Sequence, residues 1–278
     1  MTIKSNKLGL LTISKEKKFD LSEKLHGDYV FPNLKIALIL PAYNEEKNIG
    51  YVLSKIPTKV ANTVDIIVID DGSSDNTAKI AKKFDPVVLK HDVNKGNGAA
   101  TITGLNYCKE KDKYDIVLIL DADGQHDPNF IPLFINTIMK HDVDFVMGNR
   151  FEYYYDMKPA KKFCSKLLTA FYYILYRERI SDPSNGYRAL SKRILDELEF
   201  ESKYSITQEM LFKIIPHYEF REIPIKLHSR KEGKSFIKIK SYFWRMIISI
   251  LKFYILPKVN RVSKRLFKKD LTDLLGIQ

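Results

Sequence analysis

Two aspartates separated by one residue, Asp121 and Asp123, are the side chains of this sequence best suited to chemistry. They directly follow a short apolar run, so both carboxylates can turn toward one point in a tight bend. Oxygen ligands suit Mg²⁺ or Mn²⁺, and Mg²⁺ commonly takes one or two carboxylates together with substrate phosphates. The pair therefore indicates a divalent metal site that binds a phosphorylated ligand. The alternative is a loop in which both acids are solvated.

Polar residues also follow three other apolar runs of the chain. Glu45 comes after the first run, Asp70 and Asp71 come after the second, and Arg150 comes after the last. Ligands of open α/β sheets bind at the carboxyl ends of the strands, so we expect these side chains to meet at one edge of a sheet. Clustered carboxylates repel one another unless a cation or a set of donors neutralises them, which again favours a bound cation.

Apolar runs rich in β-branched residues alternate with stretches of helical character. We expect strands at 34–40, 64–69, 115–120 and 143–147. We expect helices at 45–56, 75–84, 97–110 and 128–140. Short apolar runs of this kind are typical of buried strands in a parallel sheet. The alternation predicts an α/β fold, with a mostly parallel open sheet flanked by helices.

The net charge of +12 is concentrated near one end of the 278-residue chain. Residues 226–278 contain 14 Lys or Arg and three Asp or Glu, whereas the remainder is close to neutral. This asymmetry indicates a polyanionic partner, either nucleic acid or an anionic membrane surface. The two cysteines, Cys108 and Cys164, lie far apart in the sequence, which argues against a disulfide scaffold and favours a reducing compartment.

Residues 242–256 are apolar except for Arg245, Ser249 and Lys252, which recur at helical spacing and predict one narrow polar stripe. The segment is shorter than the ~20 residues that span a bilayer. Two interpretations stay open: a core helix packed against the sheet, or an interfacial helix with its aromatic rings near lipid headgroups. A strongly basic stretch follows at 258–269. We therefore expect a basic, amphipathic C-terminal helical region.

Seven polar segments occur in a recognisable order along the chain. They are residues 40–49, 68–77, 94–100, 120–128, 148–150, 182–189 and 229–235. In this order the first five resemble the family 2 glycosyltransferases of the GT-A fold. The last two resemble the branch of dolichyl-phosphate mannose synthases and other polyprenyl-phosphate glycosyltransferases. The resemblance implies an inverting, Mg²⁺- or Mn²⁺-dependent hexosyltransferase that moves a sugar from a GDP- or UDP-sugar to a polyprenyl (dolichyl) phosphate.

The resemblance also implies roles for individual residues. The nucleotide-sugar donor would contact Pro41, Tyr43, Glu45, Ile69, Asp71, Asp121, Ala122, Arg150, Arg230 and Lys234. The metal ligands would be Asp121, Asp123 and Gln125, and the acceptor phosphate would contact Lys161 and Ser165. The catalytic residues would be Asp123, Glu209 and Arg230. Forked arginine donors suit phosphate, which supports the roles of the two arginines.

The acceptor decides whether the reaction needs a general base. A phosphate monoester is already anionic and needs none, whereas a glycan hydroxyl needs a base, and Glu209 would then become essential. A transferase acting on a glycan hydroxyl is therefore the alternative. A nucleic-acid-binding protein explains the basic C-terminal region but not the acidic sheet edge, which would repel phosphate without metal. A binding scaffold without turnover does not explain the presence of both Asp121 and Asp123.

The expected organisation has three parts. An N-terminal extension occupies 1–33, the GT-A catalytic domain 34–240, and the basic amphipathic helices 241–278. If the acceptor is a lipid phosphate, docking of the last part on the membrane would place the protein beside that acceptor. We therefore expect a cytoplasmic protein that is peripheral on the inner face of the membrane, with an anionic membrane surface as a partner and no nucleic acid.

Overall fold

A seven-stranded sheet forms the centre of the molecule. The computed structural model describes residue 31 and residues 33–57, 63–151, 159–203, 205–228 and 247–255. The strands are β1 (Ile36–Ala42), β2 (Val64–Asp70), β3 (Val87–Lys90), β4 (Ile116–Ile119), β5 (Phe145–Asn149), β6 (Arg188–Ser191) and β7 (Phe220–Pro224). Their order across the sheet is β3-β2-β1-β4-β6-β5-β7.

Six of these strands run in one direction, and β6 runs against them. β1 pairs in parallel with β2 and β4, β2 with β3, and β5 with β7, whereas β6 is antiparallel to both β4 and β5. The predicted α/β fold with a mostly parallel sheet is therefore confirmed. Because the six strands are parallel, their carboxyl ends lie at one edge, and β6 begins at that same edge.

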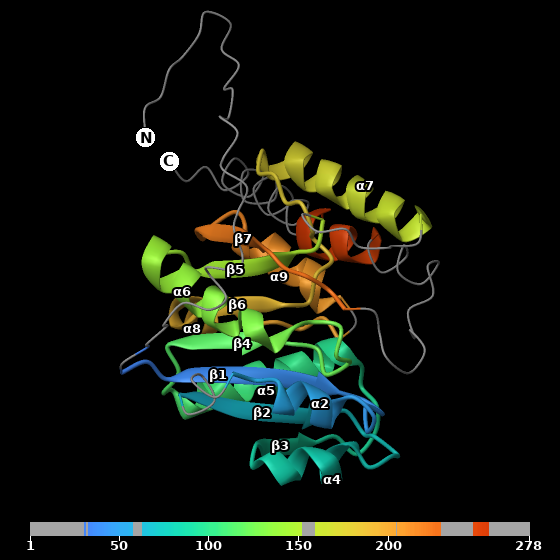
Figure 1. Ribbon diagram of the computed structural model, residues 1–278. Helices are drawn as coiled ribbons and strands as arrows, with labels where there is room; N and C mark the ends of the chain where they lie inside the picture. The colour runs from blue at the N-terminus through green and yellow to red at the C-terminus, as the bar shows by residue number, and fades with distance from the viewer. Residues whose placement is uncertain are drawn as a thin grey trace, which may run out of the picture.

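Helices cover both faces of the sheet (Figure 1). The α-helices are α2 (Ile49–Ser54), α4 (Thr77–Ala81), α5 (Asn97–Lys111), α6 (Ile131–His141), α7 (Pro159–Tyr176), α8 (Lys192–Glu197) and α9 (Ile206–Ile214). The shorter helical turns are η1 (Lys82–Phe84), η2 (Pro128–Phe130) and η3 (Leu251–Ile255), the last of which is a π-helix.

Strand periodicity divides the core into two clusters. Ile36, Leu38 and Leu40 of β1 pack with residues of α2 and α6, whereas Ala37 and Ile39 pack with residues of α5, α8 and α9. All five side chains are at least 99% buried. Burial on both faces explains why the run reads as continuously apolar rather than alternating.

Four strands lie where the sequence placed them to within two residues, but β3, β6 and β7 were not anticipated. β3 is a half-exposed edge strand, and β6 and β7 are short and contain charged residues. Phe31 also packs into the first core cluster, so the folded body includes at least this residue of the predicted N-terminal extension.

The helical segment 247–255 packs on α9 and α7, where the Tyr254 ring lies 6.3 Å from the rings of both Phe171 and Phe212. Of the predicted polar stripe, Lys252 is exposed but Ser249 is not, and Arg245 lies outside the described residues. Ser249 is 99% buried, while Ile248 and Leu251 are 56% and 46% exposed. Tyr254 packs inward against these rings, and the face of the helix that carries Ile248 and Leu251 points outward. Within the described residues, no helix is long and apolar enough to cross a membrane.

Candidate active site

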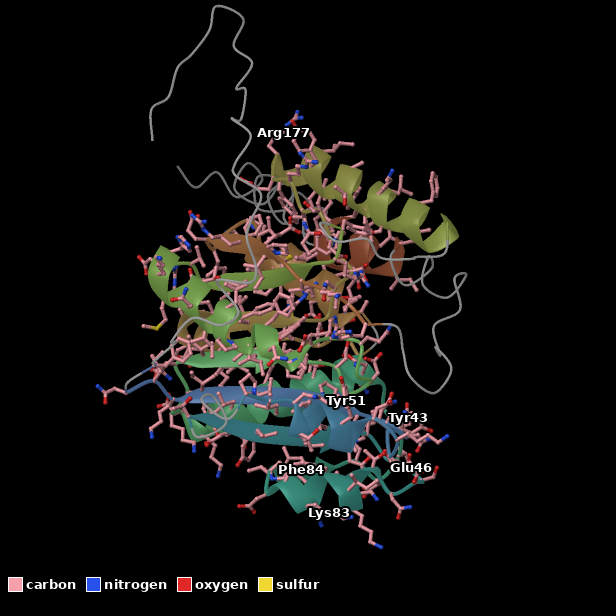
Figure 2. All side chains as sticks on the ribbon, viewed as in Figure 1. Tyr43, Glu46, Tyr51, Lys83, Phe84 and Arg177 are labelled. Atoms are coloured by element: carbon pink, nitrogen blue, oxygen red, sulfur yellow. The ribbon has the colours of Figure 1, made fainter. Side chains whose placement is uncertain are left out.

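The polar segments that follow the strands meet at the carboxyl edge of the sheet. Loops after β1, β2, β4 and β5 all begin there, and the segment 182–187 reaches the same edge because it leads into the antiparallel β6. The strand-end prediction is thereby confirmed. Tyr43 and Glu46 project from the loop after β1, at this end of the sheet (Figure 2).

Asp71 lies at the centre of the loops that follow β2 and β3. Its carboxylate accepts hydrogen bonds from the backbone N–H groups of Lys95 and Gly96, at 2.9 and 2.8 Å. The Nδ1 atom of His91 lies 2.7 Å from the same carboxylate, and His91 Nε2 lies 2.9 Å from the Thr103 hydroxyl. These bonds fix Asp71 in one orientation, and His91 is a neighbour that the sequence did not single out.

The other predicted nucleoside contacts lie beside Asp71. Pro41 and Ile69 are buried next to each other as register partners of β1 and β2. Glu45 is 92% buried, and its carboxylate accepts a hydrogen bond from Asn48 Nδ2 at 2.7 Å. Tyr43 is partly exposed, so its ring is accessible at the edge. Their role as contacts for a nucleoside stays a prediction.

Asp121, Asp123 and Gln125 lie in the loop after β4, as predicted. Asp121 Oδ1 accepts a hydrogen bond from Asn97 Nδ2 at 3.2 Å, and the Asp121 side chain is 31% exposed. Asp123 Oδ1 accepts one from the Gln125 backbone N–H at 3.0 Å. Among the described residues, no three His, Cys, Asp or Glu side chains already converge on one point. Ala122, which lies between the two aspartates, is buried.

The described side chains still provide the right donor set for a divalent cation. Gly186 packs closely against Asp121, because a Cβ at this glycine would lie only 2.8 Å from Asp121 Oδ2. His126 Nδ1, buried without a hydrogen-bond partner among the described residues, lies 3.8 Å from the same oxygen. Carboxylate oxygens suit Mg²⁺ or Mn²⁺, and an imidazole nitrogen is a common ligand of transition-metal ions.

Arg150 has a different partner from the predicted phosphate. Its Nε and Nη2 atoms form a bidentate pair with Asp182 at 2.6 and 2.7 Å, and Nη2 also donates to Ser184. Asp182 is fully buried and Arg150 is 94% buried. This pairing neutralises the guanidinium internally, which favours a structural role for Arg150. Its phosphate role stays a prediction.

Asp182 is itself held by a neighbouring acid. The Glu222 carboxylate accepts hydrogen bonds from the backbone N–H groups of Ser181 and Asp182 at 2.9–3.0 Å. Burial raises the pKa of Glu222 above its ordinary value, opposed by these hydrogen bonds. The segment that leads into β6 is therefore anchored to β7, next to the Asp121 loop.

Glu209 is fully buried and its carboxylate is occupied. It accepts hydrogen bonds from the backbone N–H groups of Glu201 and Ser202 at 2.7–3.1 Å, and it pairs with Lys213 at 2.7 Å. These bonds hold the loop before α9. The sequence indicated a catalytic role for Glu209, whereas this placement favours structural support.

The loop that Glu209 holds packs against the beginning of α5. A Cβ added at Gly98 would lie only 2.3 Å from the Ser202 carbonyl oxygen, so only glycine fits there. The neighbouring Asn97 donates to Asp121. Glu209 therefore supports the Asp121 loop indirectly. It holds the loop before α9, and that loop packs on the beginning of α5, where Asn97 contacts Asp121.

Four predicted site residues remain, and the structure describes the side chain of Ser165 alone among them. Ser165 of α7 is 98% buried, and its hydroxyl has no hydrogen-bond partner among the described residues. Lys161 lies on α7, but its side chain is outside the described part. Arg230 and Lys234 lie outside the described residues. Just before Arg230, the chain approaches the loop after β4, because the His228 backbone N–H donates to the Gln125 carbonyl at 2.8 Å.

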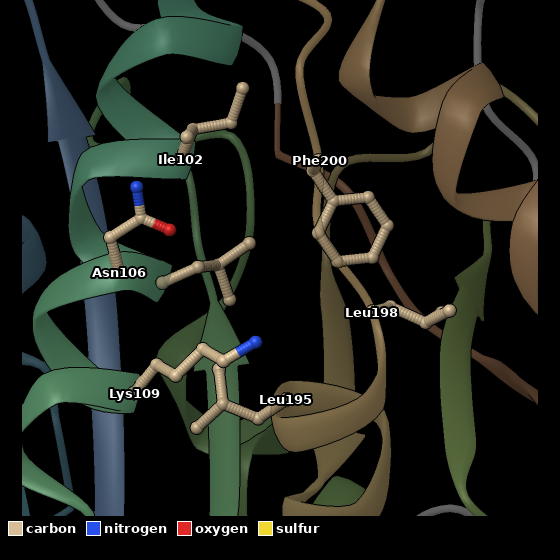
Figure 3. A pocket seen from close by; sticks show the side chains of 7 residues that line it. Ile102, Asn106, Lys109, Leu195, Leu198 and Phe200 are labelled. Atoms are coloured by element: carbon tan, nitrogen blue, oxygen red, sulfur yellow. The ribbon is translucent and has the colours of Figure 1, made fainter.

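A small recess lies on another part of the molecule, between α5 and the segment from α8 to Phe200 (Figure 3). It is lined mainly by apolar side chains, with Asn106 and Lys109 as the polar members. Lys109 already donates to the Asp196 carbonyl at 3.0 Å. The recess contains no carboxylate and is separate from the site at the sheet edge.

Comparison with solved structures identifies the class of fold. The glucosyl-3-phosphoglycerate synthase of Mycobacterium tuberculosis, crystallised with Mn²⁺ and UDP-glucose, matches with a TM-score of 0.64 and 21% identity over 78% of each chain. A second crystal structure of that synthase, in complex with Mn²⁺, UDP and glucosyl-3-phosphoglycerate, gives a TM-score of 0.62. The architecture is thus an α/β fold of the GT-A type.

Sequence comparison then gives the family. The family model described as glycosyl transferase family 2 matches residues 37–199, and this chain belongs to that family. A UDP-N-acetylglucosamine–dolichyl-phosphate N-acetylglucosaminyltransferase of Methanococcus voltae is 32% identical over 241 residues, covering 77% of this chain and 95% of the relative. A dolichol-phosphate mannosyltransferase of Pyrococcus furiosus is 28% identical over 260 residues, covering 88% and 70%.

Proposed function

We propose that this chain transfers a sugar from a UDP- or GDP-sugar to a polyprenyl phosphate, with inversion at the anomeric carbon. The observation that carries the proposal is the likeness to two relatives that are both named for transfer to a dolichyl phosphate. The first match extends over nearly the whole relative, so it includes the parts of the chain beyond the nucleotide-binding half.

The donor would bind along the sheet edge. Tyr43, Glu45 and Asp71 form the wall for the nucleoside, and Asp121, Asp123 and Gln125 would hold the divalent cation next to the diphosphate. The bound cation supplies positive charge to the departing nucleoside diphosphate. Arg230 and Lys234 would add cationic donors to the same oxygens, since the chain enters this region beside Gln125.

The acceptor phosphate would attack from the opposite side of the sugar. A phosphate oxygen forms a bond to the anomeric carbon while the bond from that carbon to the diphosphate breaks, and both electrons leave with the nucleoside diphosphate. No proton has to move, because the phosphate is already ionised. The occupied carboxylate of Glu209 agrees with a reaction that needs no base. Ser165 and Lys161 would hold the acceptor.

Glu209→Gln separates the two classes of acceptor. For a phosphate acceptor, we expect kcat to change less than about tenfold, while the free energy of unfolding falls by roughly 1–3 kcal/mol because the charged hydrogen bonds are lost. For a glycan hydroxyl, loss of a general base would lower kcat by roughly 10²–10⁴-fold. Steady-state rates and thermal unfolding measure both, with the exposed Glu219→Gln as control. A loss of the larger size without destabilisation would favour the glycan reaction.

The proposal as a whole is tested by a donor screen. The purified full chain is mixed with Mg²⁺ or Mn²⁺, a short polyprenyl phosphate and each of a panel of UDP- and GDP-sugars, and nucleoside diphosphate release is measured. We expect release with one donor class that depends on the polyprenyl phosphate. The matched control replaces it with the polyprenol, which has the same chain but no phosphate. Equal release with the alcohol, or with a soluble glycan alone, would overturn the proposal.

Two neighbouring helices support a membrane surface as the place of this reaction. Exposed apolar side chains occur along both helices, and we refer to them together as the outer apolar face. They are Phe163, Leu167, Tyr173 and Ile174 of α7, and Ile248, Leu251 and Ile255 of the segment 247–255. Lys166, Arg177 and Lys252 lie beside them and are exposed. In Figure 2, Arg177 at the end of α7 points away from the sheet.

The outer apolar face also agrees with a lipid acceptor. Ser165 lies on α7 but is buried, so the two faces of this helix turn toward different surroundings. An outer apolar face seated on lipid would hold α7 at the membrane surface, where a lipid-linked acceptor is found. We propose that the protein associates peripherally with the inner face of the cytoplasmic membrane through this face and its basic C-terminal residues.

A further inference from the structure

His126 is a buried side chain beside Asp121 whose hydrogen bonding is incomplete among the described residues. It is 94% buried, and its ring lies 5.4 Å from that of Tyr187. Its Nε2 atom lies 3.1 Å from Asn185 Oδ1, and its Nδ1 atom has no hydrogen-bond partner among the described residues. A buried polar atom without a partner is costly unless something absent from the protein itself binds to it.

The surroundings of Asn185 determine which ring nitrogen carries the proton. Asn185 Oδ1 accepts a hydrogen bond from the Tyr187 backbone N–H at 2.9 Å, and Asn185 Nδ2 lies 3.3 Å from Asp182 Oδ2. A backbone N–H can only donate, so the amide atom facing it is the oxygen. His126 Nε2 must then be the donor toward that oxygen. In the neutral ring, Nδ1 therefore carries a lone pair.

That lone pair faces a second acceptor. His126 Nδ1 lies 3.8 Å from Asp121 Oδ2, while the other oxygen of Asp121 is bound by Asn97. Two metal–ligand bonds of about 2.1 Å each span at most roughly 4.2 Å, so a cation between the two atoms can reach both. Gly186 packs directly beside Asp121 Oδ2, since a Cβ at this position would lie only 2.8 Å from that oxygen.

We infer that His126 Nδ1 is a direct ligand of the divalent cation, together with Asp121. This inference rests on the metal dependence in the proposed function. Asn185 then acts as a positioning residue, because it fixes the tautomer in which Nδ1 can bind a metal. An imidazole ligand favours a transition-metal ion such as Mn²⁺ over Mg²⁺, which prefers oxygen. The site is therefore selective among cations rather than an all-oxygen Mg²⁺ site.

Pulsed electron paramagnetic resonance of bound Mn²⁺ tests this directly. The full chain is loaded with Mn²⁺ and UDP or GDP, and nitrogen and phosphorus couplings to the metal are recorded. We expect an imidazole nitrogen coupling that shifts when the protein is labelled with ¹⁵N-histidine. We expect H126Q to lose this coupling and to bind Mn²⁺ about tenfold or more weakly, with a smaller change for Mg²⁺. H217Q, which removes an exposed histidine, should match the wild type.

Each other outcome decides against the inference in a distinguishable way. Bound Mn²⁺ that shows phosphorus coupling but no histidine nitrogen coupling overturns the role of His126 and leaves the proposed function intact. A wild-type chain that binds no Mn²⁺ with either nucleotide overturns the metal dependence and this inference with it. If H126Q does not fold, as judged by circular dichroism, the ¹⁵N-histidine comparison on the wild-type chain decides alone.

Discussion

Asp123→Asn should lower kcat/KM by at least about 100-fold, which corresponds to about 3 kcal/mol or more of transition-state stabilisation. The amide has no charge and holds a divalent cation poorly, so the charge that develops on the leaving diphosphate would be left without compensation. Asp123 lies in the loop after β4, next to Gln125 and two residues from Asp121. Release of nucleoside diphosphate, measured across a Mg²⁺ or Mn²⁺ series, gives the size of the loss.

The control for this substitution is Asp92→Asn. Asp92 is exposed and follows His91 near the same end of the sheet, so the control makes the same change in charge outside the metal loop. We expect its rate to stay close to that of the wild type. Thermal unfolding should show that both variants are folded. Undiminished turnover of Asp123→Asn in Mg²⁺ and in Mn²⁺ would mean that the loop after β4 does not hold the catalytic cation.

The second large effect concerns membranes: we expect the full chain to co-sediment with anionic vesicles and to be released as salt is raised. Apolar insertion by the outer apolar face and attraction of basic residues to anionic lipid would both contribute, the latter at about 1 kcal/mol for each well-placed Lys or Arg. A chain that ends at Pro257 lacks the basic stretch 258–269, which lies outside the described residues. It should bind more weakly and with less dependence on salt.

Substitutions in the outer apolar face separate insertion from charge attraction. Leu167→Glu combined with Leu251→Glu should weaken vesicle binding by about 100-fold, because each exposed leucine would contribute roughly 1.5 kcal/mol on burial in lipid. Phe84→Glu combined with Met139→Glu is the matched control, since both residues are exposed but lie on η1 and α6. Phe84 lies far from α7, near the edge strand β3 (Figure 2).

The membrane prediction has a clear contrary result. A full chain that stays in the supernatant with anionic vesicles at low salt would rule out docking by the outer apolar face. If both leucine substitutions instead lowered the free energy of unfolding without changing vesicle binding, these residues would belong to the core. Thermal unfolding of the same variants distinguishes this case, because exposed leucines should change stability by less than about 0.5 kcal/mol.

Local sequence patterns determined the layers of this protein and the edge at which chemistry occurs. β1, β4 and β5 are buried on both faces, as is β2 over its last four residues, so each reads as an apolar run. The polar residue that ends each run marks the carboxyl edge. Asp121, Asp123 and Asp71 were identified in this way. β6 escaped prediction because it has only four residues and begins with a buried arginine.

Only the tertiary structure decided how the polar residues are paired. Arg150 and Asp182 lie 32 positions apart, and they meet because the antiparallel β6 brings residues 182–187 to the carboxyl edge. His126 meets Asn185 for the same reason. Such pairings depend on strand order and direction, which leave no periodic pattern in the sequence.

The same distinction applies to the helical segment near the C-terminus. Its composition predicted an amphipathic helix, but not which side faces outward. Tyr254 packs against aromatic rings of α7 and α9, which buries Ser249 and leaves Ile248, Leu251 and Ile255 exposed. Sequence determined that this helix has two kinds of surface. Packing against α7 and α9 decided which one faces outward, because the contacts of Tyr254 with Phe171 and Phe212 turn the side that carries Ser249 inward.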